Sequence, residues 1–286
     1  MAKSQSRSQN IHDLSRTPGI SWPAMFLFII SLGLYAAVSA LAISGVLSLW
    51  AASLLNGFIL YLLFSPMHEA LHRTLSTNRF LNETIGRISL AAFIPAAPLE
   101  IARWIHLKHH AYTTHDIDPD NFMHHGPWYV LPLRWANFDI YYLAAFFRAD
   151  EKSVRQRRPV VFLYLLSFAA LIAGFIFAGL FFEFVVLWFL PTRIALALVG
   201  FVFVFLPHYP AQISAKEDKY KATTIRLGKE WLLTPLMVYQ NYHLIHHLYP
   251  SVPFYKYIKV WNLRRDELIQ KNPAIQNGLK LRPSWK

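Results

Sequence analysis

Residues 17–68 read TPGISWPAMFLFIISLGLYAAVSALAISGVLSLWAASLLNGFILYLLFSPMH and contain no Asp, Glu, Lys or Arg. One crossing of a bilayer needs about 20 apolar residues, so this stretch is long enough for two helices with a turn between them. We expect the turn near Gly45, in the segment ISGV at 43–46. A single long helix is disfavoured, because helices of soluble proteins average about 11–12 residues. The stretch therefore predicts a pair of membrane spans.

Two further uncharged runs, Pro159 to Phe182 and Ile194 to Ala215, predict a second pair of spans. Glu183 and Arg193 lie between these runs, so we expect an outer turn around 183–193. Arg193 would then lie near the membrane interface and extend its side chain toward water. The count of four spans predicts an all-α integral membrane protein.

The segment between the two pairs of spans contains apolar stretches that are too short to cross a bilayer. Pro95 and Pro98 interrupt one of them, at 88–101. The other, 127–147, is rich in aromatic residues but is broken by Pro132 and by charged residues. This composition is typical of a helix that lies on the membrane surface.

The composition of the whole chain agrees with a membrane protein. Of its 286 residues, 55% are apolar and only 15% are charged, whereas soluble domains carry about a quarter charged residues. We expect one membrane domain at 17–265, preceded by a disordered cytoplasmic arm at 1–16 and followed by a cytoplasmic tail at 266–286. There is no cysteine, which excludes disulfides, thiolate metal sites and cysteine nucleophiles.

The distribution of the basic residues predicts the topology. The chain has a formal net charge of +12, and 27 of its 28 Lys and Arg lie before residue 17, at 67–158 or after residue 215. The two predicted outer turns carry only Arg193. By the positive-inside rule, both termini and the middle segment are cytoplasmic, in a bacterial inner or thylakoid-type membrane. Because the positive charge follows the membrane-proximal segments, and no nucleic-acid motif is present, nucleic acid is not an expected partner.

Nine of the thirteen histidines form a repeated pattern. The motifs are HEALH at 68–72, HLKHH at 106–110 and HLIHH at 243–247, while His208 stands alone after the fourth predicted span. On a helix, residues three and four positions apart share a face, so each motif directs two or three imidazoles the same way. Every motif is predicted on the cytoplasmic side, where the imidazoles can converge in a histidine-rich helical cap.

This many buried imidazoles predict metal ions. Without a metal, many ring nitrogens would lack a partner, each at a cost of about 1–3 kcal/mol. Eight or nine imidazoles exceed the three or four ligands of one zinc ion, so two metals are expected. Nitrogen ligands suit iron, zinc or copper alike. Iron is favoured by the membrane setting, because a site at the lipid boundary suggests an apolar substrate, whose unactivated C–H bonds require redox chemistry with O2.

The three motifs, their order and the paired spans resemble the membrane fatty-acid desaturase and hydroxylase superfamily over residues 60–260. Three longer stretches are similar to the cyanobacterial-type carotenoid β-ring hydroxylases within it: WIHLKHH at 104–110 with DPD at 118–120, LPH at 206–208, and NYHLIHHLYPSVP at 241–253. The resemblance implies a non-haem di-iron oxidoreductase that uses O2 to hydroxylate a carotenoid β-ring, taking β-carotene toward zeaxanthin. The ligands that it implies are His68, His72, His106, His109, His110, His208, His243, His246 and His247.

Other polar residues near the motifs are candidates for supporting roles. Asp116, Asp118 and Asp120 follow the second motif closely enough to accept a hydrogen bond from a ligand imidazole, although a polar turn around Pro119 is an equal alternative. Asn241 precedes the third motif and could hold a ligand or a water. His115, His124 and His125 are expected to be surface residues, and Glu69 to be solvated or to support a ligand.

The electrons for such chemistry have to come from another protein. The chain has no dinucleotide fingerprint and no cysteine for an iron–sulfur cluster, so an external donor such as ferredoxin is implied. Lys216, Lys219 and Lys221 offer one basic surface for it, although the positive-inside rule explains them equally well. An alternative function is a fatty-acyl-lipid desaturase with the same ligands. A membrane zinc hydrolase or receptor is a distant alternative, because such sites need fewer histidines.

Overall fold

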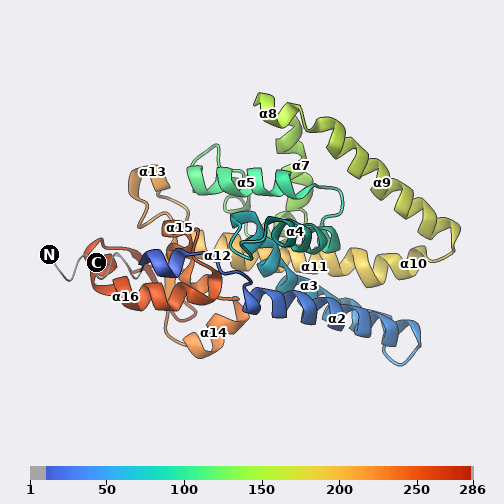
Figure 1. Ribbon diagram of the computed structural model, residues 1–286, viewed down its shortest axis with the longest axis horizontal. Helices are drawn as coiled ribbons and strands as arrows, with labels where there is room; N and C mark the ends of the chain where they lie inside the picture. The colour runs from blue at the N-terminus through green and yellow to red at the C-terminus, as the bar shows by residue number, and fades with distance from the viewer. Residues whose placement is uncertain (1–10, 285–286) are drawn as a thin grey trace.

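The computed structural model describes residues 11–284, which are mostly helical with one small two-stranded sheet (Figure 1). The helices in chain order are α2 (Trp22–Ile43), α3 (Leu49–His72), α4 (Arg79–Phe93), α5 (Leu99–Tyr112), η1 (Asn121–Met123), α6 (Leu131–Ala136), α7 (Phe138–Arg148), α8 (Lys152–Arg155), α9 (Arg158–Phe177), α10 (Phe181–Phe184), η2 (Val185–Phe189), α11 (Leu190–Val199), η3 (Gly200–Phe205), α12 (Leu206–His208), α13 (Ala215–Asp218), α14 (Glu230–Leu236), η4 (Gln240–Tyr242), α15 (His243–Leu248), η5 (Phe254–Lys256) and α16 (Tyr257–Gln270). Strand β1 (Thr224–Leu227) pairs in parallel with β2 (Ala274–Asn277).

Four helical stretches are long and apolar enough to cross a membrane, as predicted: Trp22–Ile43, Leu49–His72, Lys152–Phe177 and Phe181–His208. The first two are joined at Gly45, whose φ of +79° is a conformation that glycine adopts without strain. Half of the most apolar part of the second and fourth spans is buried, against 11% for the first and 6% for the third. The second and fourth spans therefore form the centre of the bundle, and the first and third lie outside them.

A close contact between the two central spans depends on a glycine. A Cβ atom placed on Gly57 of α3 would lie 2.6 Å from the Cγ2 atom of Ile194 on α11. This distance is far below van der Waals contact, so the lack of a side chain at position 57 lets the two helices approach. Small residues commonly have this role between membrane helices.

The second outer turn differs from the prediction. It lies at residues 178–180, where Gly179 has φ +71°, and not around 183–193. Glu183 and Arg193 are both inside the fourth span. The glycine ends the third helix, whereas isolated charged residues do not end one. Arg193 also does not extend toward water, because its guanidinium forms two hydrogen bonds with the Asp139 carboxylate, at 2.9 and 2.7 Å. Pairing removes the need to place this charge at the interface.

The segment between the two pairs of spans has the predicted breaks, but one predicted helix is two shorter helices. Helix α4 ends at Phe93 and α5 begins at Leu99, so Pro95 and Pro98 separate them as predicted. The stretch 127–147 contains two short helices, α6 and α7, and not one. Asn137 separates them with φ −134° and ψ 23°, outside the helical range. A position on the membrane surface stays a prediction.

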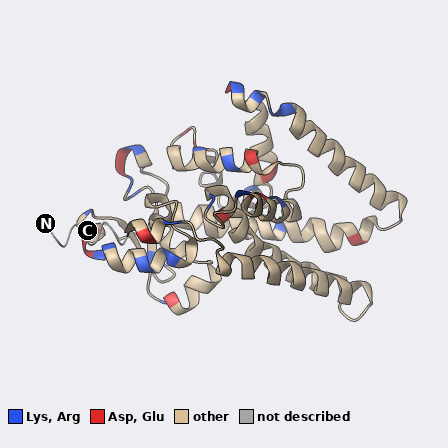
Figure 2. Ribbon diagram, viewed as in Figure 1, with Lys and Arg blue, Asp and Glu red and all other residues tan. Residues whose placement is uncertain are grey.

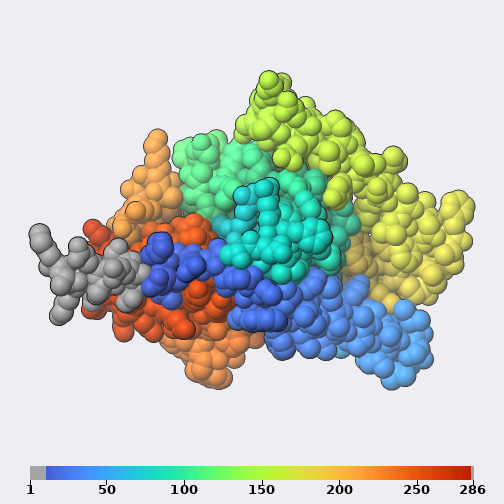
Figure 3. Space-filling view, in the orientation of Figure 1, coloured from blue at the N-terminus to red at the C-terminus, as the bar shows by residue number. Residues whose placement is uncertain are grey.

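Both ends of the described chain contact the rest of the protein. Residues 1–10 of the predicted disordered arm lie outside the described residues, but residues 11–15 are helical, and Ile11 and Leu14 pack against the main core. In Figure 3 this first described segment lies against the C-terminal part of the chain, where Lys256 Nζ donates a hydrogen bond to the Leu14 carbonyl at 3.2 Å. The predicted tail begins inside α16, and its described residues, 266–284, include β2.

The apolar and charged parts of the molecule are separated. Figure 2 shows few charged residues along α2, α9, α10 and α11, and many more around α5, α8, α13 and α16. The turns α2–α3 and α9–α10 lie together at one end of the bundle, while α12 and α15 lie toward the other (Figure 1). The histidine motifs are therefore built where the spans meet the charged cap.

Candidate metal centre

The histidine motifs lie on helix faces, as their spacing predicts. His68 and His72 form the last turn of α3, which ends at Arg73 with φ +60°. The second motif lies in the C-terminal half of α5, and the third makes up most of α15. His208 is the last residue of α12. Four separate elements thus bring the nine imidazoles to one place.

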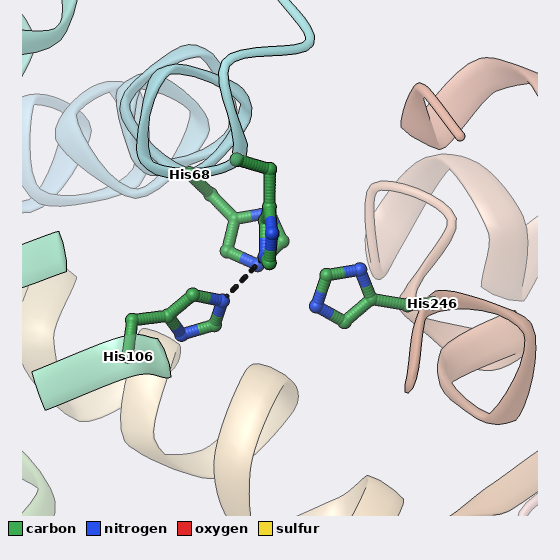
Figure 4. A group of neighbouring side chains, drawn as sticks. His68, His106 and His246 are labelled. Atoms are coloured by element: carbon green, nitrogen blue, oxygen red, sulfur yellow. Dashed lines mark hydrogen bonds between the residues drawn. The ribbon is translucent and has the colours of Figure 1, made fainter. Parts of the chain in front are cut away.

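The nine imidazoles converge as two groups of four with a ninth between them. One group contains His68, His72, His106 and His246, and Figure 4 shows three of these directed at one another from different elements. The second group contains His109, His208, His243 and His247. His110 lies close to both His246 and His247. Within each group one nitrogen per ring lies within 4.8 Å of the others. This spacing is close to that of imidazoles that share an ion, each about 2 Å from it.

The Nε2 atoms face the centre of these groups. The distance between the Nε2 atoms is 2.7 Å for His72 and His106, and 2.9 Å for His110 and His246. In the second group, His243 Nε2 lies 3.1 Å from that of His208 and 3.0 Å from that of His247. The atoms that meet at the centre are thus ring nitrogens from all the motifs.

The opposite nitrogens of five rings have hydrogen-bond partners. His208 Nδ1 lies 3.2 Å from the Ala222 carbonyl oxygen, and His243 Nδ1 lies 2.5 Å from Gln240 Oε1. His247 Nδ1 lies 3.3 Å from Thr113 Oγ1, a hydroxyl that already donates its hydrogen to a carbonyl of α5.

The remaining two are His109, whose Nδ1 is 3.0 Å from Asp118 Oδ1, and His246, whose Nδ1 is 2.8 Å from Tyr257 Oη. An acceptor at Nδ1 places the proton there and leaves a lone pair on Nε2. In the second group, the Nε2 lone pairs of His208, His243 and His247 therefore point at one another at about van der Waals distance. These lone pairs repel one another unless a cation lies between them.

A shared proton does not replace that cation. Burial and the neighbouring imidazoles hold the pKa of His243 and of His247 well below the ordinary value, so both rings are neutral at pH 7. The same causes lower the pKa of His106, His110 and His246. Neutral imidazole is the form that binds a metal.

His109 is the exception and has a carboxylate partner. Burial lowers its pKa, but the charges of Asp118 and Asp120 outweigh burial and raise it to about 9. Asp118 is held in place because the backbone N–H groups of Thr114 and Asp120 donate to it, at 2.8 and 2.9 Å. Asp120 accepts a hydrogen bond from the Tyr142 hydroxyl. Such a carboxylate fixes the orientation of the ring and increases its basicity toward a metal.

Replacing Asp118 with asparagine is expected to weaken metal binding by about 10- to 100-fold, because His109 loses the carboxylate that orients it. The measurement is the metal retained per chain during titration with a chelator. Asp116→Asn is the matched control, because Asp116 belongs to the same turn but is exposed. Equal metal retention by the two variants would contradict the role of Asp118.

The structure separates the candidate supporting residues. It brings Asp118 and Asp120 to His109 and leaves Asp116 exposed. The Asn241 amide nitrogen donates to Thr234 Oγ1 at 3.1 Å and to the Arg226 carbonyl at 3.4 Å, and not to a clustered histidine. Glu69 is buried and accepts hydrogen bonds from Thr74 Oγ1 at 2.7 Å and from Phe254 N at 3.2 Å, so it joins α3 to the chain before α16.

Other residues of the site were missed or misplaced by sequence reasoning. Gln240, Thr113 and Tyr257 contact ligand rings, and no motif distinguishes them from ordinary core residues. His124 is not the surface residue that was predicted: both its ring nitrogens are buried without a partner among the described residues, and its ring lies 5.5 Å from that of His208. Its burial lowers its pKa.

An apolar cavity adjoins the imidazoles. Its inner compartment, of about 70 Å³, is lined by His68, His106, His109 and His243 together with Asp120, Tyr142 and apolar side chains. An outer compartment of about 280 Å³ lies beside it toward α9 and is mostly apolar, with Asn137, Asp139 and Arg193 among its lining residues. The two share the lining residues Leu90, Phe93, Ile94, Ala102, Ile105 and Tyr142. The arrangement can hold an apolar molecule with one end at the histidines.

Comparison with known proteins agrees with this geometry. The model of the fatty acid desaturase family matches residues 44–277, a range that includes all nine clustered histidines. Dihydrorhizobitoxine desaturase of Bradyrhizobium elkanii is 26% identical over 279 residues, covering 86% of this chain and 77% of its own length. The beta-carotene ketolases of Paracoccus sp. strains PC1 and N81106 are 29% and 30% identical, each over 68% of this chain and 71% of its own length.

These relatives perform oxidations, and the family match makes this protein an oxygen-dependent oxidoreductase. The match extends over most of the chain and over every motif from which the metal centre is built. The chain belongs to the fatty acid desaturase family.

Proposed function

We propose that the protein is a membrane-bound di-iron enzyme that uses O2 to oxidise a C–H bond on the ring of a carotenoid, by hydroxylation of a β-ring. In that reaction one oxygen atom enters the substrate and the other leaves as water, so two electrons and two protons come from outside. The nine clustered histidines, four in each group and His110 between them, are the proposed ligands, with Asp118 and Asp120 orienting His109.

The proposal rests on the Nε2 atoms of His208, His243 and His247, whose lone pairs face one another at 3.0–3.1 Å. The lowered pKa values of His243 and His247 keep these two rings neutral. Imidazole nitrogen suits iron, zinc and copper. Two iron ions bound here would supply the redox chemistry toward O2 that oxidation of an unactivated C–H bond requires. A zinc hydrolase or receptor would leave most of the nine imidazoles without a use.

The protein's own residues would hold the metals and the substrate in position and exclude water from the site. The hydrogen-bond partners at Nδ1 would hold five rings with Nε2 toward the metals. The walls of the inner compartment, such as Phe93 and Phe203, exclude water from the space next to His68 and His106. A lipid-soluble substrate entering the outer compartment from the membrane would meet an apolar surface up to the histidines.

The choice of substrate rests on relatives and motifs. Two of the relatives described above are beta-carotene ketolases, which favours a carotenoid over an acyl chain. The same relatives make ketone formation on the ring a second candidate. A fatty-acyl-lipid desaturase of the same family is the remaining alternative, and the desaturase of Bradyrhizobium elkanii keeps it open.

The setting of the reaction is also part of the proposal. We propose that the metal centre and both termini lie on the cytoplasmic side of a bacterial inner or thylakoid-type membrane, which the basic residues near the histidine motifs support. The electrons would come from a soluble carrier on that side, such as ferredoxin.

The test is mass spectrometry of lipid extracts from a bacterial host that makes β-carotene. Cells with the intact chain are compared with cells that express His109→Ala, which lacks one proposed ligand. We expect a carotenoid that has gained oxygen without losing hydrogen, only with the intact chain. Gain of oxygen with loss of two hydrogens would assign ketone formation instead. New double bonds in acyl lipids with unchanged carotenoid would contradict the carotenoid proposal.

A further inference from the structure

A charged groove lies on the opposite side of α5 from the metal centre. It has a volume of about 890 Å³ and extends between α4, α5 and α8. Six cations line it: Arg73, Arg79, Arg87, Arg103, Lys108 and Arg157. Three carboxylates, Glu83, Glu100 and Glu151, also line it, which leaves an excess of three positive charges. Figure 2 shows this concentration of charge on α5 and α8.

The ion pairs inside the groove leave the excess charge at its rim. Glu83 pairs most closely with Arg103 at 2.8 Å, Glu100 with Arg87 at 2.6 Å, and Glu151 with Lys108 at 3.3 Å. The other three arginines, Arg73, Arg79 and Arg157, are exposed. Within residues 11–284, Arg79 and Arg157 form no ion pair shorter than 4 Å. These two side chains are available to an acidic partner.

One helix separates this groove from the metal ligands. Trp104, Leu107 and Lys108 line the groove, while His106 and His109 on the other face of α5 belong to the metal centre. An α-helix with its side chains is about 10–12 Å across. Arg103 also links the two sides, since its guanidinium donates to the carbonyls of Ala70 and Leu71, in the last turn of α3 between His68 and His72. A carrier in the groove would therefore lie about one helix diameter from the imidazoles.

We propose that this groove is the docking surface for a small acidic electron-transfer protein. The inference rests on the proposed function, because hydroxylation with O2 needs two electrons from a donor. The chain has no cysteine to hold an iron–sulfur cluster of its own, and nine of its thirteen histidines are committed to the metal centre. Carboxylates of the donor would pair with the exposed arginines, and opposite charge would steer the encounter.

A lipid phosphate is the competing occupant, because the groove adjoins Lys152, where the third span begins. The three carboxylates within the groove disfavour it, since they repel a compact anion. A protein surface can avoid them by placing its own carboxylates against the rim. A single phosphate group would also fill only a small part of the groove, whose volume is about 890 Å³.

The test measures binding of a plant-type [2Fe–2S] ferredoxin to the metal-loaded protein in nanodiscs of neutral phosphatidylcholine. The variant Arg79→Glu/Arg157→Glu is expected to raise the Kd at least tenfold, which is about 1.4 kcal/mol, and to flatten its salt dependence. Reduction of the centre by dithionite, which needs no docking, should be unchanged. The matched control is Lys216→Glu/Lys219→Glu, which reverses one exposed charge on α13 and one at its C-terminal cap, and it should leave the Kd unchanged.

Two results would overturn the proposal. If only the Lys216→Glu/Lys219→Glu variant weakens binding, the donor docks on α13. The second result is that the Arg79→Glu/Arg157→Glu variant binds ferredoxin as tightly as the parent protein does but associates less with phosphatidylglycerol vesicles. In that case the groove is a lipid site. Because binding is measured without a substrate, a failure of carotenoid oxidation would be seen separately and would not decide this test.

Discussion

Replacing His246 with alanine is expected to reduce the metal content from about two ions per chain to one or fewer, and to reduce the oxidised product below detection. His246 belongs to the first group of imidazoles and also to the set with His110 and His247, so its loss affects both metals. The Nε2 atoms of His246 and His110 are 2.9 Å apart, which places the ring at the centre of the site. The measurements are metal analysis of the purified protein and mass spectrometry of the product.

Two controls separate ligation from general damage. His125→Ala removes an exposed histidine that contacts Asn121, and it should keep both the metal and the product. Tyr257→Phe keeps the His246 ring but removes the hydroxyl that is hydrogen-bonded to its Nδ1, and it should cost about 10- to 100-fold in metal affinity. If His246→Ala retained both ions at full occupancy, His246 would not be a ligand.

The histidine site could be predicted because its signal is local. The spacing within each motif fixes which residues share a helix face, and all nine predicted histidines lie in the groups that the structure brings together. Gly45 and the uncharged residues around it gave the first pair of spans in the same way. Length, apolarity and helical periodicity suffice for features of this kind.

Features that depend on distant contacts could not be predicted. Arg193 looked like the end of a span, but Asp139, on a separate helix 54 residues earlier, pairs with it inside the bundle. Asp116 and Asp118 are indistinguishable in the sequence, yet only the turn geometry directs Asp118 to His109. Tyr257 approaches His246 because α16 packs on α15, a contact with no motif. The strand β2 forms only because β1, 50 residues away, supplies its partner.

Replacing Ala102 with phenylalanine is expected to lower product formation by more than about 100-fold while the metal content stays unchanged. Ala102 lies one helical turn before His106 and lines both compartments of the apolar cavity. The inner compartment has only about 70 Å³, so an added phenyl ring would occupy the path between the compartments and keep the reacting carbon from the histidines.

The experiment compares three variants in the host that makes β-carotene. Ala102→Val adds less volume and should show a smaller loss than Ala102→Phe. Ala37→Phe makes the same change on an exposed position of α2 and should have no effect on product or metal. Full activity of Ala102→Phe with its metal bound would mean that the substrate does not pass α5 at this point. A loss graded by side-chain volume at constant metal content would place the route to the metal centre between α5 and the walls shared by the two compartments, with Ala102 as the residue that sets its width.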